Sequence, residues 1–241
     1  MERQVTLRVF RYKRGQDTPR YDTFTVPVDE DTTVLVALQD VRRDLDPSLT
    51  LRHSCHHASC GTCGMKINGR EQLACVVRVL DLDARTVVVE PLDNAPVVSD
   101  LVVDMDPFYA QYGTVERPLL RHSEFLPEAK TPDGIEMYRR YENCIECGAC
   151  VSACPISGSD PSYRGPAALA AARRLVDEPR GRDSQLALDW VDDERGCWRC
   201  HVAMECTEAC PSDVDPAGKI MALRCELIRQ RFRRLFDFVR S

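Results

Sequence analysis

The chain has 241 residues, enough for two domains, and its 38 acidic side chains outnumber its 32 basic ones, giving a net charge of −6 at pH 7. The basic residues are dispersed as well as outnumbered, which argues against a nucleic-acid-binding protein. No stretch approaches the roughly 20 apolar residues that span a bilayer, and the beginning MERQVTLRVF lacks a signal-peptide pattern, so we expect membrane association only through a partner.

The first elements are predicted from the spacing of apolar residues. Residues 3–10 and 21–28 alternate apolar and polar side chains, as half-buried strands do, and predict a hairpin. The segment TTVLVALQDVRRDL at 32–45 predicts a helix, for which we expect Asp31 or Thr32 to be the cap. Its expected buried side consists of Val34, Leu35 and Leu38.

Four cysteines follow in RHSCHHASCGTCGMKINGREQLAC, with the spacing of a plant-type 2Fe-2S site. These expected ligands are Cys55, Cys60, Cys63 and Cys75. Asn68-Gly69 predicts a type I′ hairpin turn, whose register sets Cys63 opposite Ala74 and returns Cys75 to the side of Cys63. Thiolates suit the site because soft sulfur ligands hold iron-sulfur cores.

The loop around these cysteines contains glycines and histidines as well. Gly61 and Gly64 permit backbone conformations that let the loop wrap a cluster closely. His53, His56 and His57 raise the alternative of a Rieske site, in which two histidines replace two cysteines. Four cysteines already complete the set, so we interpret the histidines as surface or interface residues that tune the potential of the cluster.

The apolar segment TVVVEPL at 86–92 predicts a further strand. Two strands, a helix and more strands describe a small mixed sheet crossed by one helix, which is the β-grasp arrangement of plant-type ferredoxins. Glycines and prolines with little apolar periodicity then predict a linker at 113–134. We therefore expect a β-grasp 2Fe-2S domain at 1–112 and a second domain at 135–241.

The second domain is expected to be all-α and similar to bacterial ferredoxins, so the predicted fold class is α+β. The segment PAALAAARRLVDE predicts a helix that starts behind Pro166, and Asp215-Pro216 supplies a cap and a first-turn proline for a long helix to about residue 237. Apolar residues recur on the long helix at helical spacing and predict a stripe packed over the clusters. They are Ile220, Leu223 and Leu227.

Seven cysteines of the second domain form the runs CIECGACVSACP and CHVAMECTEACP. In the bacterial ferredoxin run the fourth cysteine ligates the other of two clusters. Crossing the ligands in this way gives a 4Fe-4S site at Cys144, Cys147, Cys150 and Cys210. The second set, Cys154, Cys200 and Cys206, has Ala203 where a thiolate would stand, and therefore predicts a 3Fe-4S cluster.

Structural zinc is the main alternative, because CxxC pairs are common in tetrahedral zinc sites. Here three groups match iron-sulfur spacing, two of them end in Cys-Pro, and no pair of CxxC motifs closes four ligands as a zinc ribbon would. Thirteen cysteines, an odd number, favour a reducing, intracellular setting. Cys197 and Cys225 remain outside the sets, and we interpret both as free buried thiols.

The whole chain resembles a known family, the iron-sulfur subunit of succinate dehydrogenases and fumarate reductases. The resemblance is carried by the three motifs in their order, by the vacancy at Ala203, and by the phrases SDLVVDMDPFYAQY, CIECGAC and WRCH. It implies that electrons enter from FAD on a flavoprotein subunit, pass the 2Fe-2S, 4Fe-4S and 3Fe-4S clusters, and leave to quinone at a membrane-anchor subunit. Succinate and FAD would bind the partner.

The same resemblance suggests quinone contacts. His201 stands where the family often has a histidine, and either faces the quinone or the anchor or is hydrogen-bonded at a subunit interface. Pro155 either touches quinone or only shapes the chain after Cys154. The tryptophans that family members often place after this Cys-Pro are replaced here by ISGSDPSYRG at 156–165.

We therefore expect a peripheral electron-transfer subunit of a succinate:quinone or quinol:fumarate oxidoreductase, on the cytoplasmic face of a bacterial inner membrane. The alternatives are an iron-sulfur subunit of another flavoprotein complex and a diffusible ferredoxin. The long second domain and Ala203 count against a free ferredoxin.

Overall fold

The computed structural model describes residues 3–15, 18–113, 143–177 and 184–240. The chain forms two compact units. The first consists of residues 1–107 together with 145–153, and the second of residues 108–144 and 154–241. The predicted linker at 113–134 lies, apart from Gly113, outside the described residues, and the division at 1–112 and 135–241 stays a prediction.

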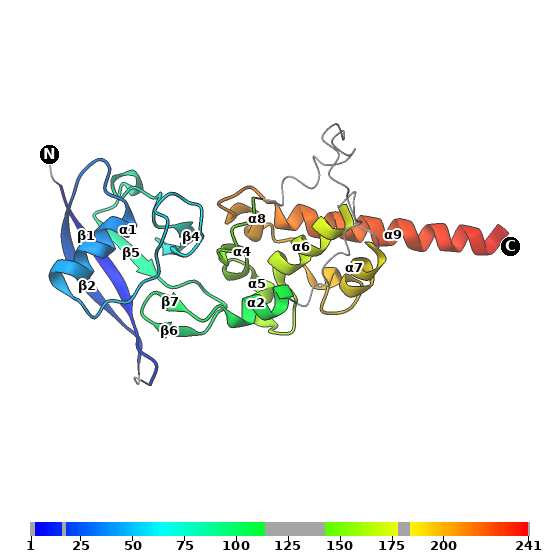
Figure 1. Ribbon diagram of the computed structural model, residues 1–241, viewed down its shortest axis with the longest axis horizontal. Coiled ribbons are helices and arrows are strands. Elements are labelled where there is room, and N and C mark those ends of the chain that lie inside the picture. Colours follow the sequence, from blue (N-terminus) through cyan, green and yellow to red (C-terminus); the bar gives the residue numbers. More distant parts are fainter. Residues whose placement is uncertain (1–2, 16–17, 114–142, 178–183, 241) are drawn as a thin grey trace, which may run out of the picture. The chain divides into compact units, whose positions relative to one another are not determined.

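A five-stranded mixed sheet forms the centre of the first unit (Figure 1). Its strands run in the order β2-β1-β5-β3-β4. The bounds are β1 Arg3–Arg11, β2 Arg20–Val28, β3 Gly64–Ile67, β4 Arg70–Leu73 and β5 Thr86–Glu90. Strand β1 pairs antiparallel with β2 and parallel with β5, so the predicted N-terminal hairpin is confirmed. A small antiparallel pair, β6 (Val97–Ser99) and β7 (Val102–Val103), forms a separate sheet.

Helix α1 (Val34–Asp40) packs on the sheet and continues into a π-helical turn at Val41–Leu45. Its predicted apolar side is fully buried, together with Leu7, Val9 and Ile67 from the strands. The expected cap was wrong. Thr33 is the cap, because its hydroxyl accepts the Val36 N–H at 3.3 Å. The Thr32 hydroxyl instead donates to Asp29 at 2.5 Å, in the turn before the helix.

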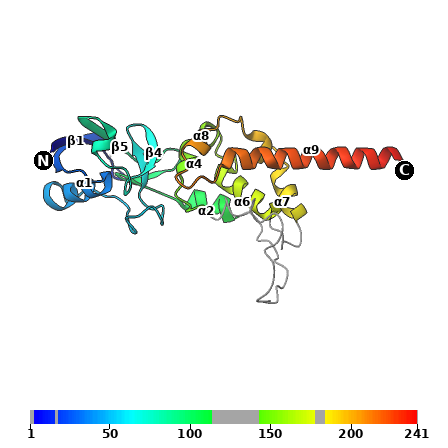
Figure 2. The ribbon, with the colours of Figure 1, turned by 90° about the horizontal axis from the view of Figure 1, so that it is seen from above.

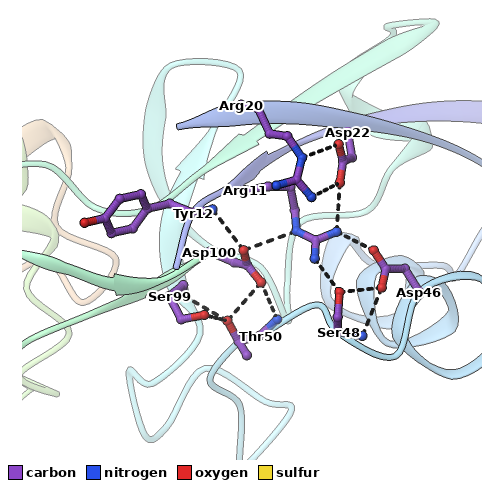
Figure 3. Close-up of polar contacts among 9 residues, drawn as sticks. All are labelled: Arg11, Tyr12, Arg20, Asp22, Asp46, Ser48, Thr50, Ser99 and Asp100. Carbon is purple, nitrogen blue, oxygen red and sulfur yellow. Dashed lines mark hydrogen bonds and ion pairs between the residues drawn. The ribbon is translucent and has the colours of Figure 1, made fainter. Parts of the chain in front are cut away.

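A buried arginine joins distant parts of the first unit (Figure 3). The Arg11 side chain, 2% exposed, pairs with Asp22 at 3.0 Å, Asp46 at 2.5 Å and Asp100 at 3.2 Å. Asp100, itself buried, also accepts the backbone N–H of Tyr12 at 3.0 Å. Burial alone would lower the pKa of Arg11, but the carboxylates of Asp46 and Asp100 outweigh it and the pKa is raised. The network connects β1, β2, the turn after α1 and the β6–β7 loop.

The described part of the second unit is helical (Figures 1 and 2). The helices are α2 Asp106–Gly113, which starts at the end of the first unit, α5 Pro155–Ser159, α6 Gly165–Asp177, α7 Ser184–Val191, α8 Glu205–Glu208 and α9 Pro216–Arg240. In both views α9 runs past α6 and α7, and its C-terminal end extends beyond them. The predicted stripe on α9 is buried and packs with Leu169 and Leu188. Nowhere in the described ranges is a helix long and apolar enough to cross a membrane.

Candidate iron-sulfur sites

The β3–β4 hairpin positions the fourth cysteine of the first group. Asn68 and Gly69 have φ of 50° and 78°, as a type I′ turn requires, and Ile67 pairs with Arg70. The Ala74 N–H donates to the Cys63 carbonyl at 3.1 Å, so the predicted register is confirmed. It returns Cys75 to the side of Cys63, and both sulfur-bearing residues are buried.

The loop before β3 directs backbone N–H groups at sulfur. Cys55 Sγ accepts from the N–H groups of His57 (3.5 Å), Ser59 (3.3 Å) and Cys60 (3.3 Å). These bonds, that of His57 first, lower the pKa of Cys55 to about 7, because N–H donors favour the thiolate. Ala58 donates to Cys75 Sγ at 3.4 Å. The loop therefore favours charged sulfur, the form that iron binds.

At the buried side of the same site, the surroundings of Cys63 disfavour the thiolate instead. Burial raises the pKa of Cys63 to about 12, with the neighbouring Cys75 adding to the effect. A buried thiolate is costly unless a cation offsets its charge. Iron would supply that charge, so the donor set fits a 2Fe-2S cluster held by Cys55, Cys60, Cys63 and Cys75.

The segment 145–153 packs against this loop within the first unit. Gly61 has φ +70°, and a Cβ there would lie 2.7 Å from the Ile145 carbonyl oxygen and 2.9 Å from Cys147 Cβ. The contact is therefore so close that only glycine fits. It brings Cys147, an expected ligand of the second cluster, against the 2Fe-2S loop.

Hydrogen bonds hold the far end of that segment. The Ser152 hydroxyl donates to Glu71 at 2.9 Å and accepts the Asp93 N–H at 2.8 Å. The Asn94 amide donates to the carbonyls of Val151 and Ser152 at 2.9 and 2.8 Å. Helix α4 (Ala149–Ser152), which contains Cys150, is thus fixed on the first unit. The other expected 4Fe-4S ligands, Cys144 and Cys210, belong to the second unit, so this ligand set stays a prediction.

The two cysteine loops 144–150 and 200–206 share one backbone pattern. The third and fifth residues of each loop have positive φ: Glu146 (53°) and Gly148 (84°) in one, Val202 (59°) and Met204 (67°) in the other. A short helix follows each, α4 in one case and α8 in the other. Ala203 therefore occupies the position that Cys147 holds in the first loop.

The three expected 3Fe-4S ligands line one cavity in the second unit. Its wall contains Cys154, Cys200 and Cys206, the predicted quinone contacts Pro155 and His201, and also Tyr163, Ala203 and Ile220. Burial raises the pKa of Cys206 to about 12, and the nearby Cys154 and Cys200 add to the effect. Three thiols that line one cavity next to Ala203 fit a cluster with three protein ligands.

Mononuclear zinc requires ligands that converge on a single ion. In the ranges that the structure describes, no three His, Cys, Asp or Glu side chains are grouped in that way. A cluster contains several irons and sulfides, so it accepts sulfur ligands that are spaced more widely.

Comparisons with known proteins identify two iron-sulfur domains in the chain. Residues 6–110 match the family of 2Fe-2S iron-sulfur cluster binding domains, and residues 140–214 match the 4Fe-4S dicluster domain. The fumarate reductase iron-sulfur subunit of Mycobacterium tuberculosis is 36% identical over 222 residues, 90% of each chain. The succinate dehydrogenase iron-sulfur subunit of Paracoccus denitrificans is 35% identical over 88% of this chain and 85% of that protein.

The chain belongs to the family of succinate dehydrogenase and fumarate reductase iron-sulfur subunits. It is thus a subunit of an oxidoreductase and carries a 2Fe-2S and a 4Fe-4S dicluster domain. A chain from the Mycobacterium smegmatis Sdh1 complex in the apo form shares the fold, with a TM-score of 0.87 and 22% identity, over 96% of this chain and 98% of that one.

The cysteines outside the ligand sets of this iron-sulfur subunit differ from each other. Cys197 is buried as expected, and burial raises its pKa to about 11. Cys225 was expected to be buried but is exposed on α9, because it points away from the stripe of Ile220, Leu223 and Leu227. Of the three histidines near the 2Fe-2S loop, His56 and His57 are exposed and His53 is half-buried beside Gln39.

Two side chains near the expected 3Fe-4S ligands are not apparent from the sequence. Arg224 on α9 donates to the carbonyl of Cys197 at 2.8 Å and to that of Cys200, which places a positive charge behind a ligand loop. Tyr163, buried in the cavity wall, lies in the loop that follows the first cysteine run. A lone Arg on a helix and a lone Tyr in a loop give no signal of their own, because only the tertiary fold brings them to the cysteines.

Proposed function

We propose that this subunit conducts electrons from the FAD of a flavoprotein subunit, through 2Fe-2S, 4Fe-4S and 3Fe-4S clusters in that order, to quinone at a membrane anchor. Cys55, Cys60, Cys63 and Cys75 would hold the first cluster, Cys144, Cys147, Cys150 and Cys210 the second, and Cys154, Cys200 and Cys206 the third. The main support for this proposal is that Cys154, Cys200 and Cys206 line one cavity beside Ala203.

The contacts of the chain support this order. The segment with Cys147 lies against Gly61, next to the 2Fe-2S ligand Cys60, and electron transfer slows steeply as the gap between donor and acceptor grows. Pro155 and His201 are exposed and line the cavity of the third cluster, which suits an exit to quinone. Cys154 and Cys206 are buried, whereas Pro155 and His201 are exposed, so the cavity wall reaches from the core of the unit to its surface.

We also infer the finer fold and setting. The sheet crossed by α1 suits the β-grasp fold of plant-type ferredoxins, and the helices of 135–241 suit a bacterial-ferredoxin-like domain. The subunit would be peripheral, on the cytoplasmic face of a bacterial inner membrane. The relatives named for succinate dehydrogenase and fumarate reductase support such a complex with a flavoprotein and an anchor.

The test is a redox titration of the intact complex by EPR, with succinate and dithionite as reductants. We expect three cluster signals, including an oxidised-state 3Fe-4S signal that disappears on reduction by succinate. The complex should also co-purify with a flavin-containing subunit and a membrane subunit. Zinc in place of iron, or a chain that transfers electrons without a flavoprotein partner, would contradict the proposal.

A further inference from the structure

Tyr163 has a buried hydroxyl for which the described residues supply no partner of ordinary hydrogen-bond geometry. The residue lies between α5 and α6, is 4% exposed, and lines the cavity of Cys154, Cys200 and Cys206. Its hydroxyl has no hydrogen-bond partner among the described residues. An unpaired buried hydroxyl costs about 1–3 kcal/mol, and native proteins seldom leave one without a purpose.

The surrounding chain fixes this tyrosine in place. Its N–H donates to the Asp160 carbonyl at 3.1 Å, and the next residue, Arg164, donates its N–H to the Arg195 carbonyl at 3.0 Å. The Arg164 guanidinium also lies 4.3 Å from the centre of the Trp190 ring and pairs with Asp193. Backbone bonds on both sides and the packed Arg164 side chain keep the phenol in the cavity wall.

The phenol shares the cavity wall with the three cysteines, Cys154, Cys200 and Cys206. A protonated phenol beside sulfur can act only as a donor toward it, because the cysteine sulfurs carry the negative charge when they bind iron. The cavity therefore places a phenolic donor in the same wall as three cysteine sulfurs.

We propose that the Tyr163 hydroxyl donates a hydrogen bond to a sulfur of the cluster held by Cys154, Cys200 and Cys206, and so raises the reduction potential of that cluster. The inference rests on the proposed function. Reduction adds one electron and one negative charge to the cluster, and a hydrogen bond to sulfur stabilises the reduced form more than the oxidised form. Tyr163 is thus a positioning residue that makes the last relay a better electron acceptor.

The test is Tyr163→Phe in the intact complex, which removes the donor and keeps the ring. At a fixed ambient potential near the midpoint, the ratio of reduced to oxidised 3Fe-4S cluster should fall by roughly tenfold, as expected for the loss of one bond to a charged acceptor. Pulsed EPR of the oxidised cluster, compared before and after exchange into D2O, should show one exchangeable-proton coupling fewer in the variant than in the unmodified complex. Tyr21→Phe, an exposed tyrosine on β2 whose hydroxyl bonds Glu90, is the control and should change neither.

The outcomes separate the two proposals. Absence of a 3Fe-4S signal in the unmodified complex would contradict the proposed function itself. A normal signal with unchanged potential and couplings in Tyr163→Phe would overturn only the role of Tyr163, as would a change confined to the KM for quinone. If the variant does not assemble, the test uses the unmodified complex labelled with ring-deuterated tyrosine. Deuterium modulation of the 3Fe-4S signal is then expected. Its absence would overturn the inference.

Discussion

In the proposed function, Ala203 determines the type of the third cluster, because it leaves that site one sulfur ligand short. The backbone of its loop repeats that of 144–150, including positive φ at Val202, a β-branched residue for which this conformation is strained. Such strain persists only where the surroundings enforce it. The loop therefore has the same positions of positive φ as 144–150, and Ala203 stands where that loop has Cys147.

Ala203→Cys should convert the cluster. Three corners are already held, and the new thiolate occupies the position that Cys147 has in the matching loop, so a 4Fe-4S cluster should assemble. The oxidised-state 3Fe-4S EPR signal should vanish, iron per chain should rise by one, and quinone reduction should fall because the new cluster has a lower potential. Ala203→Ser, without a soft ligand, should keep the 3Fe-4S signal. An unaltered signal and iron content in Ala203→Cys would disprove the role of the missing ligand.

His201 is the residue through which we expect contact with quinone. It is exposed, directly follows Cys200 and lines the cavity of the cluster. His201→Ala should lower the rate of quinone reduction by roughly tenfold, the effect of one lost hydrogen bond, while succinate still reduces the clusters. Glu208→Ala, an exposed change on α8 outside the cavity lining, is the control. Unchanged quinone kinetics would leave His201 as an interface residue only.

At the scale of elements, sequence patterns within a segment were sufficient to predict most of the strands and helices discussed, whereas contacts between distant segments were not predicted. The Asn68-Gly69 turn fixes the register of its own hairpin, and apolar spacing gave β1, β2, α1 and α9. The cap of α1 was missed because three adjacent polar residues compete for it, and side-chain bonds made in the folded turn favour Thr33. The Arg11 network was not predicted, since Arg11 and Asp100 are 89 positions apart.

That network predicts a pH-dependent contribution to stability. Hydrogen bonds from Ser48 and then Arg11 hold the pKa of Asp46 well below its usual range. Because the pKa of Asp46 is lower in the folded than in the unfolded protein, its ionisation stabilises the fold at any pH above the unfolded-state pKa near 4. This stabilisation is lost as the pH falls toward the folded-state pKa. Asp46→Asn should therefore lower the free energy of unfolding by about 1–3 kcal/mol, equally at pH 7 and pH 5.5.

The measurement is the urea midpoint of the cluster-loaded protein at both pH values. Asp81→Asn serves as the control, because Asp81 pairs with Arg78 at the exposed surface and should contribute less than about 1 kcal/mol. A loss for Asp46→Asn no larger than that of Asp81→Asn would show that the buried network is not a net stabiliser. The same conclusion would follow if the difference in the free energy of unfolding between Asp46→Asn and the unmodified protein disappeared well above pH 4.

At the scale of the whole chain, the cysteine spacing indicated the family, the order of the motifs and the grouping of Cys154, Cys200 and Cys206. It did not indicate that residues 145–153, which lie beyond the expected linker, pack into the first compact unit. That contact depends on shape at Gly61 and on single hydrogen bonds from Ser152 and Asn94, which leave no periodic pattern. Tyr163 escaped prediction for the same reason.

The contact at Gly61 should control electron flow between the first two clusters. Gly61→Ala forces the new Cβ against Ile145 and Cys147, so the segment 145–153 must move away from the 2Fe-2S loop. Gly69→Ala is a matched control, because Gly69 also has positive φ, at +78°, but its added Cβ meets nothing within 4 Å. Both variants incur the backbone cost of about 1–2 kcal/mol for alanine in this conformation, and only the first adds the clash.

Freeze-quench EPR after mixing the intact complex with succinate separates the effects. In Gly61→Ala the 2Fe-2S signal should appear at the normal rate, while reduction of the later clusters should slow severalfold, because the gap that the electron crosses has widened. Gly69→Ala should show normal rates at both steps. If both variants slow equally, backbone strain rather than the contact is responsible. If neither slows, electrons do not pass from the 2Fe-2S loop to the segment that carries Cys147, and the proposed order of clusters would have to be abandoned.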